Sequence, residues 1–257
     1  RVLGEARRRL AEGHPELVLT GINIGTYRDP GSGARLADLV RVVGRLEGLV
    51  RLRISSIEPG DVGDALVAAI AETPAVAPHL HVPLQSGDPG VLRAMGRGYT
   101  VGEYLDACRR ARAAIPGLNL TTDAIVGFPG EDEAAFRATA RVVEDLGMSK
   151  VHVFPHSPRP GTPAAGMTGR VPPGELRERA RRLRDLSDRL GFAHRARRVG
   201  DADAVLVETV HEDGSRTGLG GDYTRFVLPP GAGGPGELVP VRVAGVAGEH
   251  LRGEPLR

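Results

Sequence analysis

The segment LNLTTDAIVGFPGE, residues 118–131, is an apolar, β-branched run that ends in a glycine- and proline-rich turn. Four similar runs lie at residues 16–20, 50–55, 79–83 and 150–154. Their spacing, roughly 30–40 residues, is what a strand followed by a crossover helix requires. Because helical periodicity fills the gaps, the sequence predicts a parallel α/β sheet, either doubly wound or closed toward a barrel.

Composition narrows the class of protein. The chain has 257 residues, 40% of them hydrophobic, and a formal net charge of +2. That is enough apolar material for a large domain with a smaller one, and it excludes a polycationic tail. A single cysteine excludes a disulfide framework, a four-thiolate zinc site and an iron–sulfur cluster held by three cysteines of this chain. No apolar run is long enough to cross a membrane, so we expect a cytoplasmic protein.

The pattern changes toward the end of the chain. Residues 170–198 form a polar helical segment with ten arginines against four acidic residues, which Gly191 interrupts without clearly ending it. Short apolar runs separated by glycine- and proline-rich turns follow, at residues 205–207, 225–227 and 239–243. They are typical of a small antiparallel β-barrel. We therefore expect one domain at residues 1–198, ending in an arginine-rich connector, and a barrel at residues 199–257.

Small or polar groups follow each of the five predicted strands. In parallel α/β proteins, ligands bind at the carboxyl edge of the sheet, where the loops converge. Together these groups predict a pocket there for a polar ligand with several hydroxyls. They are Thr20, Gly21 and Asn23; Ser55, Ser56 and Glu58; Gln85 and Ser86; Asp123 and Gly127; and the segment that begins at Phe154.

The order of these motifs resembles that of the radical S-adenosylmethionine methylthiotransferases. The first loop, Thr20-Gly21-Ile22-Asn23, is similar to that of the subgroup that modifies threonylcarbamoyladenosine in tRNA, and residues 199–257 resemble a TRAM domain. The motifs are LTGINIG (19–25), LRISSIEP (52–59), HLHVPLQSG (79–87), LRAMGRGYT (92–100), TTDAIVGFPGE (121–131) and HVFPHSPRPGTPAA (152–165).

The resemblance implies a partial, open radical-SAM β/α barrel followed by a TRAM-like barrel that binds tRNA. The complete enzyme would add a methylthio group to carbon 2 of threonylcarbamoyladenosine beside the anticodon. It would use S-adenosylmethionine, 4Fe–4S clusters and an electron donor protein.

The resemblance also assigns roles within the cofactor site. Thr20, Gly21 and Asn23 would receive the methionyl amine, and Ser55, Ser56 and Glu58 would contact the methionine or ribose. Gln85 and Ser86 would read the ribose hydroxyls. Asp123 and Gly127 match the loop that packs on adenine, and Phe154 would cover the other side of the base.

One feature of the family is missing from this sequence. The family's CxxxCxxC loop and a second set of three cysteines hold its clusters, and neither set is present. Cys108 lies on an apolar helical stripe, so we expect a buried structural thiol. We therefore expect an amino-terminally truncated chain that lacks the first barrel strand and the cluster loop. Alone, it should be catalytically inactive.

Two other readings remain open. In the first, the chain is a non-catalytic tRNA-binding remnant, in which Arg181, Arg182 and Arg184 face phosphates. These arginines could instead form pairs within their helix, such as Arg181 with Asp185 or Arg182 with Glu178.

The second alternative is a metal-dependent hydrolase on a β/α barrel. His79 and His81 lie on one face of a predicted strand, and Asp123, His152 and His156 could complete a metal site. Against this reading, such hydrolases usually place the His-x-His pair on their first strand.

Overall fold

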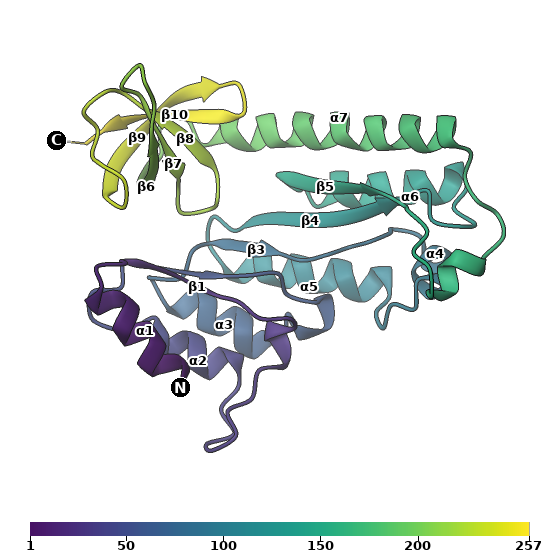
Figure 1. Ribbon diagram of the computed structural model, residues 1–257, viewed down its shortest axis with the longest axis horizontal. Coiled ribbons are helices and arrows are strands. Elements are labelled where there is room, and N and C mark those ends of the chain that lie inside the picture. The colour runs from purple at the N-terminus through teal and green to yellow at the C-terminus, as the bar shows by residue number, and fades with distance from the viewer. Residues whose placement is uncertain (257) are drawn as a thin grey trace.

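The computed structural model describes residues 1–256, in which helices and strands alternate up to a long final helix (Figure 1). The strands of this part are β1 (Glu16–Leu19), β2 (Arg51–Ile54), β3 (His79–His81), β4 (Asn119–Val126) and β5 (Lys150–Pro155). The α-helices are α1 (Val2–Ala11), α2 (Leu36–Val43), α3 (Asp64–Glu72), α4 (Pro89–Ala94), α5 (Val101–Ala114), α6 (Glu133–Asp145) and α7 (Pro173–Arg197). Short 3-10 helices span Ile24–Thr26, Pro59–Asp61 and Pro163–Gly166.

All neighbouring strands of this part are parallel. One sheet pairs β1 with β2, and a second has the order β3-β4-β5. A parallel bridge between Leu52 and Val76 brings the two sheets together next to β3. The five predicted strands and the partial α/β barrel are confirmed, because each apolar run became a strand within two residues of its expected bounds.

The sheet presents two chemically different faces. Leu80, Leu120 and Val151 are buried in the hydrophobic core together with side chains of α5 and α6. Since side chains alternate along a strand, the neighbouring residues of β3, β4 and β5 point to the opposite, inner face. That inner face is polar, which is the feature that positions the site described below.

The chain ends in a closed barrel of five strands, in the order β10-β8-β7-β6-β9. Four of its pairings are antiparallel, but β8 and β10 are parallel, so the expected antiparallel barrel is in fact mixed. Its core is separate from that of the sheets. The strands are β6 (Ala202–Val210), β7 (Arg216–Leu219), β8 (Arg225–Leu228), β9 (Leu238–Ala247) and β10 (His250–Pro255).

Helix α7 joins the two parts. It runs alongside β5 and ends at the barrel (Figure 1). Gly191 does not break it, and a Cβ at that position would lie 2.8 Å from the Ser149 carbonyl oxygen, so the glycine permits a close approach to the sheet. Within residues 1–256, no helix is both long enough and apolar enough to cross a membrane.

Candidate functional site

The carboxyl ends of the five strands meet at one edge. Backbone hydrogen bonds connect them, each from a residue just after one strand to a carbonyl oxygen of a neighbouring strand. The convergence predicted from the sequence is therefore present, and it does not depend on side-chain conformation. The bonds run from Ser55 N to Leu19 O (2.9 Å), Ile57 N to His81 O (3.0 Å), Gln85 N to Asp123 O (2.9 Å) and His156 N to Val126 O (2.8 Å).

Two residues at this edge have left-handed backbone conformations. Gln85 has φ 64° and is almost fully buried, an uncommon combination for a residue with a side chain. Gly127 has φ 75°, and a Cβ there would collide with Leu176 of α7. Its N–H donates to Glu131 Oε1 at 2.9 Å, and Arg179 of α7 binds the same carboxylate oxygen at 2.9 Å. The loop after β4 is thus fixed by buried contacts.

The predicted cofactor residues differ in accessibility. Thr20, Gly21, Asn23, Ser56 and Phe154 are exposed; Ser55, Glu58 and Asp123 are half-buried; and Gln85, Ser86 and Gly127 are buried. The Ser86 hydroxyl faces into the protein, where it accepts a hydrogen bond from Asp88 N at 3.2 Å and lies 3.4 Å from the Thr139 hydroxyl. Ser86 therefore supports its loop in this structure.

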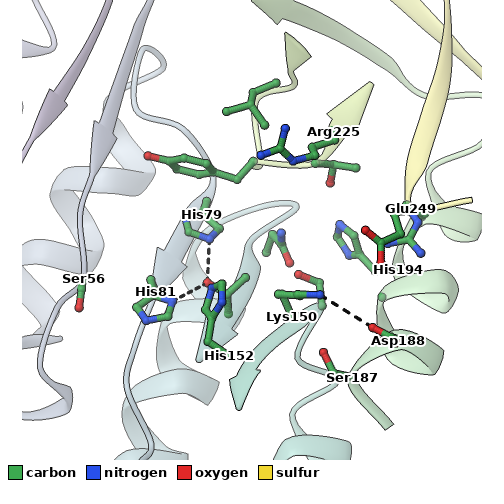
Figure 2. Close-up of a pocket in the computed structure, with 18 of the residues that line it drawn as sticks. Ser56, His79, His81, Lys150, His152, Ser187, Asp188, His194, Arg225 and Glu249 are labelled. Carbon is green, nitrogen blue, oxygen red and sulfur yellow. Dashed lines mark hydrogen bonds and ion pairs between the residues drawn. The ribbon is translucent and has the colours of Figure 1, made fainter. Parts of the chain in front are cut away.

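A cavity of about 780 Å³ lies between the inner face of the sheets, α7 and the terminal barrel (Figure 2). Of the predicted cofactor residues, Ser55 and Ser56 line this cavity, and the others are not among its lining residues. The remaining wall combines three parts of the chain: His79, His81, Asn119, Thr121, Lys150 and His152 from the sheet; Ser187, Asp188, His194 and Arg195 from α7; and Tyr223, Thr224, Arg225 and Glu249 from the barrel.

Imidazole groups dominate the sheet wall of this cavity. The Thr121 hydroxyl lies 3.0 Å from His79 Nε2 and 2.9 Å from His81 Nδ1. His81 Nε2 lies 3.2 Å from Asp123 Oδ1, and the ring of His152 is 5.6 Å from that of His81. Burial lowers the pKa of His79 to about 3, and burial together with His81 lowers the pKa of His152. Both rings are therefore neutral near pH 7.

The structure brings together only part of the ligand set of a hydrolase. His81, Asp123 and His152 form a cluster in which the potential ligand atoms lie within 4.8 Å of one another. His79 packs instead against Tyr223 in a tilted arrangement, with ring centroids 4.5 Å apart. His156 packs edge-on against Phe128. Of the five residues that the hydrolase hypothesis assigns to a metal site, His79 and His156 thus lie outside the cluster.

The arginines proposed to bind RNA differ in how they are paired. Arg181 lies 2.7 Å from Glu178 and 2.7 Å from Asp185, so the expected Arg181–Asp185 pair is present. Glu178 pairs with Arg181 and not with Arg182, which instead reaches Glu133 of α6 at 2.9 Å. Arg184 is exposed and belongs to no ion pair within the described part of the chain.

The barrel residues in the cavity wall were missed by sequence analysis. Tyr223 and Arg225 lie far from the strand-end motifs in the sequence, and no local pattern marks them as lining a site. Tyr223 has φ 67°, which places its ring between the barrel and the sheet. Lys150 and His194 were likewise not assigned to the pocket, because their position depends on how α7 packs against β5.

The chain does not supply ligands for an iron–sulfur cluster. Cys108, its single cysteine, is fully buried on α5, which confirms the structural thiol expected from the sequence. Burial raises the pKa of Cys108 to about 11. Since a cluster needs several converging thiolates, the residues of this chain do not fit one.

The sequence of the chain is similar to one protein family and to several curated proteins. The model of the family described as Radical SAM superfamily matches residues 1–143. The chain is 40% identical over 97% of its length to the tRNA-2-methylthio-N(6)-dimethylallyladenosine synthase of Thermobifida fusca, of which it covers 52%. It is also 40% identical over 79% of its length to the threonylcarbamoyladenosine tRNA methylthiotransferase MtaB of Thermotoga maritima, of which it covers 47%. The chain therefore spans about half the length of the curated relatives it matches.

Among solved structures, the fold is similar to that of coproporphyrinogen III oxidase (HemN) from Escherichia coli, described as a Radical SAM enzyme. The TM-score is 0.54 at 15% identity, and the match covers 74% of this chain and 45% of that chain. At this identity the similarity supports the fold alone.

Proposed function

The chain belongs to the Radical SAM superfamily, and from this premise we propose that it is the cofactor- and RNA-binding part of a tRNA adenosine methylthiotransferase. The observation that carries the proposal is the edge where backbone hydrogen bonds join the five strand ends, beside a polar cavity that Ser55 and Ser56 of this edge share with the terminal barrel. Relatives named as tRNA-2-methylthio-N(6)-dimethylallyladenosine synthases, or as a threonylcarbamoyladenosine tRNA methylthiotransferase, align with up to 98% of the chain. We also propose a cytoplasmic location, where tRNA is available, and a division into residues 1–198 and 199–257.

The proposed product is an adenosine beside the anticodon that carries a methylthio group on carbon 2. For the substituent on N6, the loop Thr20-Gly21-Ile22-Asn23 supports threonylcarbamoyl, the group named for the Thermotoga maritima relative. Most of the relatives compared are instead named for dimethylallyladenosine. We propose the threonylcarbamoyl group as the substituent on N6, and the dimethylallyl group is the competing outcome of the test.

The residues at the strand ends fit S-adenosylmethionine as a ligand. Thr20 and Asn23 are exposed and offer oxygens to an ammonium group, and Ser55 and Ser56 offer hydroxyls on the cavity side. Phe154 is half-exposed at the end of β5 and can cover a purine. Ser86 is engaged inside its loop, so the proposed contact with the ribose is assigned to Gln85. When bound, the cofactor supplies the methyl group.

Glu131 and Arg179 contribute by fixing the loop proposed to pack on adenine. Both side chains are buried, and their pair holds the Gly127 N–H at the carboxyl edge. No radical step is assigned to this chain, because its residues do not fit an iron–sulfur cluster. In the complete enzyme, the clusters and the electron donor protein would provide that chemistry.

Cofactor binding tests the proposal without requiring catalysis. We expect the chain to bind S-adenosylmethionine in equilibrium dialysis, and Phe154→Ala to weaken binding by about 5-fold or more, because base–aromatic stacking contributes roughly 1–3 kcal/mol. Phe192→Ala is the matched control, since Phe192 is 56% exposed on α7 and Phe154 is 50% exposed. No binding, or equal effects of the two variants, would contradict the cofactor site.

RNA binding tests the substrate. Anticodon stem–loops with a threonylcarbamoyl, a dimethylallyl or an unmodified adenosine beside the anticodon are compared by competition. We expect the threonylcarbamoyl form to bind most tightly. Preference for the dimethylallyl form would overturn the choice of substituent, and equal binding of all three would overturn recognition of the modified base.

A further inference from the structure

The cluster of His81, Asp123 and His152 occupies the inner face of three adjacent strands. Asp123 of β4 and His152 of β5 are paired in the sheet. His81 of β3 is paired with Thr121, which lies two residues before Asp123 on β4 and so on the same face. All three side chains therefore point to the same side of the sheet. His81 and His152 line the cavity (Figure 2), and the potential ligand atoms of the three residues lie within 4.8 Å of one another.

The spacing of these atoms fits a small divalent cation. Zn²⁺ binds histidine nitrogen and carboxylate oxygen at about 2.0–2.2 Å, so two ligand atoms of a tetrahedral site lie about 3.4 Å apart. His81 Nε2 and Asp123 Oδ1 are already 3.2 Å apart. The ligand atom of His152 lies within 4.8 Å of the other two, so it needs to approach by at most about 1.4 Å to match this geometry. The His152 side chain is exposed.

The surroundings also orient the first imidazole. His81 Nδ1 lies 2.9 Å from the Thr121 hydroxyl, which leaves Nε2 facing Asp123 and the cavity. A hydrogen bond at the second ring nitrogen is the usual way in which proteins fix the tautomer and direction of a metal-binding histidine. The same Thr121 hydroxyl also lies 3.0 Å from His79 Nε2, and this second hydrogen bond helps to fix the position of the hydroxyl that orients His81.

Charge and access are compatible with a cation at this position. Lys150, on the same strand as His152, is directed toward Asp188 of α7, at 3.8 Å (Figure 2). The cavity provides space for additional ligands from water on the side opposite the sheet. Two imidazoles and one carboxylate with open positions are a donor set suited to Zn²⁺ or Fe²⁺ and poorly suited to Mg²⁺ or Ca²⁺.

We propose that His81, Asp123 and His152 form a binding site for one divalent transition-metal ion in the cavity between the sheets and the terminal barrel. The site is distinct from any iron–sulfur cluster, because it contains no thiolate. It uses nitrogen and oxygen ligands from β3, β4 and β5 and leaves at least one position open to the cavity. The proposal does not depend on the proposed tRNA-modifying function.

Titration with Co²⁺ tests the site directly, because Co²⁺ replaces Zn²⁺ in such sites and its visible absorption reports coordination. The chelator-treated chain of 257 residues is titrated with Co²⁺, and Zn²⁺ is then added as a competitor. We expect one Co²⁺ per chain, displaced by Zn²⁺. His152→Ala and Asp123→Asn should each weaken binding at least about tenfold, since even loss of an outer partner costs about 10–100-fold in affinity.

The matched control is His156→Ala, which removes an imidazole just beyond the same strand but outside the cluster. It should bind Co²⁺ within twofold of the unaltered chain. The melting temperature of each metal-free variant shows that it is folded. Absence of stoichiometric binding overturns the proposal, and so does binding by His152→Ala and Asp123→Asn at unaltered affinity. An equal loss in His156→Ala would place the ion elsewhere and also overturn it.

Discussion

The guanidinium carbon of Arg53 lies 3.9 Å from the centre of the Tyr223 ring, across the junction between β2 and the terminal barrel. Arg53 also donates to the carbonyl oxygens of Gly220 at 2.8 Å and Gly221 at 3.1 Å, and it pairs with Glu16 of β1 at 2.7 Å. Because these groups are largely buried, the barrel is attached to the sheet by specific contacts. These contacts thus hold the barrel side of the cavity wall against the sheet.

Removing the Tyr223 ring should weaken this junction. Tyr223→Ala loses the contacts with Arg53 and His79, and we expect the free energy of unfolding to fall by about 1–3 kcal/mol. Tyr223→Phe keeps the ring and should stay within about 0.5 kcal/mol of the unaltered chain. Urea unfolding measures both variants. Equal losses for the two would show that the hydroxyl, and not stacking, is what matters.

Stability at the junction should also depend on pH through Asp222. Its carboxylate is buried, which raises its pKa, but the hydrogen bond from His194 and the charge of Arg198 outweigh burial, and the pKa is well below the usual range. A depressed pKa in the folded state contributes stability above the unfolded value of about 3.9, and that contribution is lost as the pH falls through and below it.

We therefore expect the unaltered chain to lose this contribution mainly as the pH falls below about 4, toward the depressed pKa of Asp222. Asp222→Asn should lose about 3 kcal/mol at pH 7, because it leaves charged partners poorly compensated, and should show a shallower acid limb. Urea unfolding at pH 7, 4, 3 and 2 measures both effects. If the free energy of unfolding fell equally with pH in the two proteins, Asp222 would be excluded as the titrating group.

The sequence predicted those elements of the fold that a short stretch of apolar residues marks. Each strand of the sheets lies in a short apolar run, and helices with an apolar stripe lie between these runs. In the barrel, β7 (Arg216–Leu219) and β10 (His250–Pro255) were missed, because they contain glycine and charged residues. The parallel pairing of β8 and β10 depends on barrel closure, which no local pattern encodes.

The part of the candidate site that lies at the strand ends was predictable from the sequence. Strand ends converge because parallel strands share an edge, so residues such as Asn23 and Ser55 could be grouped from sequence alone. The inward turn of Ser86 and the pairing of Arg182 with Glu133 depend on contacts with α6. The cavity wall contributed by Tyr223 depends on domain docking. Such long-range contacts leave no local pattern in the sequence.

Gly191 should be intolerant of even a methyl group. Gly191→Ala would normally stabilise a helix interior by up to about 1 kcal/mol, but its Cβ would lie 2.8 Å from Ser149 O, so we expect a net loss of about 1–3 kcal/mol. Gly174→Ala in the first turn of the same helix has open space around it and should be neutral or slightly stabilising. Thermal unfolding compares them. A stabilised Gly191→Ala would refute the close approach of α7 to β5.

Cys108 should be unreactive in the folded protein. Its thiol is fully buried and burial raises its pKa to about 11, so little thiolate forms at pH 8 and reagents cannot reach it. We expect iodoacetamide to leave the native chain unmodified and to alkylate one thiol per chain in denaturant, as read by mass spectrometry. Rapid labelling of the native chain would indicate that α5 opens readily.

Arg184 should contribute more to RNA binding than Arg181 does. Arg181 is already balanced by Glu178 and Asp185, whereas Arg184 is exposed and belongs to no ion pair among residues 1–256. We expect Arg184→Ala to reduce the salt dependence of anticodon stem–loop binding by about one unit of slope, the value for one lost phosphate contact. Arg181→Ala should change the slope by less, because freeing its two carboxylates adds repulsion without removing a phosphate contact. Binding is measured by fluorescence anisotropy at several salt concentrations. If neither variant changes the slope, α7 lies outside the RNA-binding surface, and the phosphate contacts must come from other arginines.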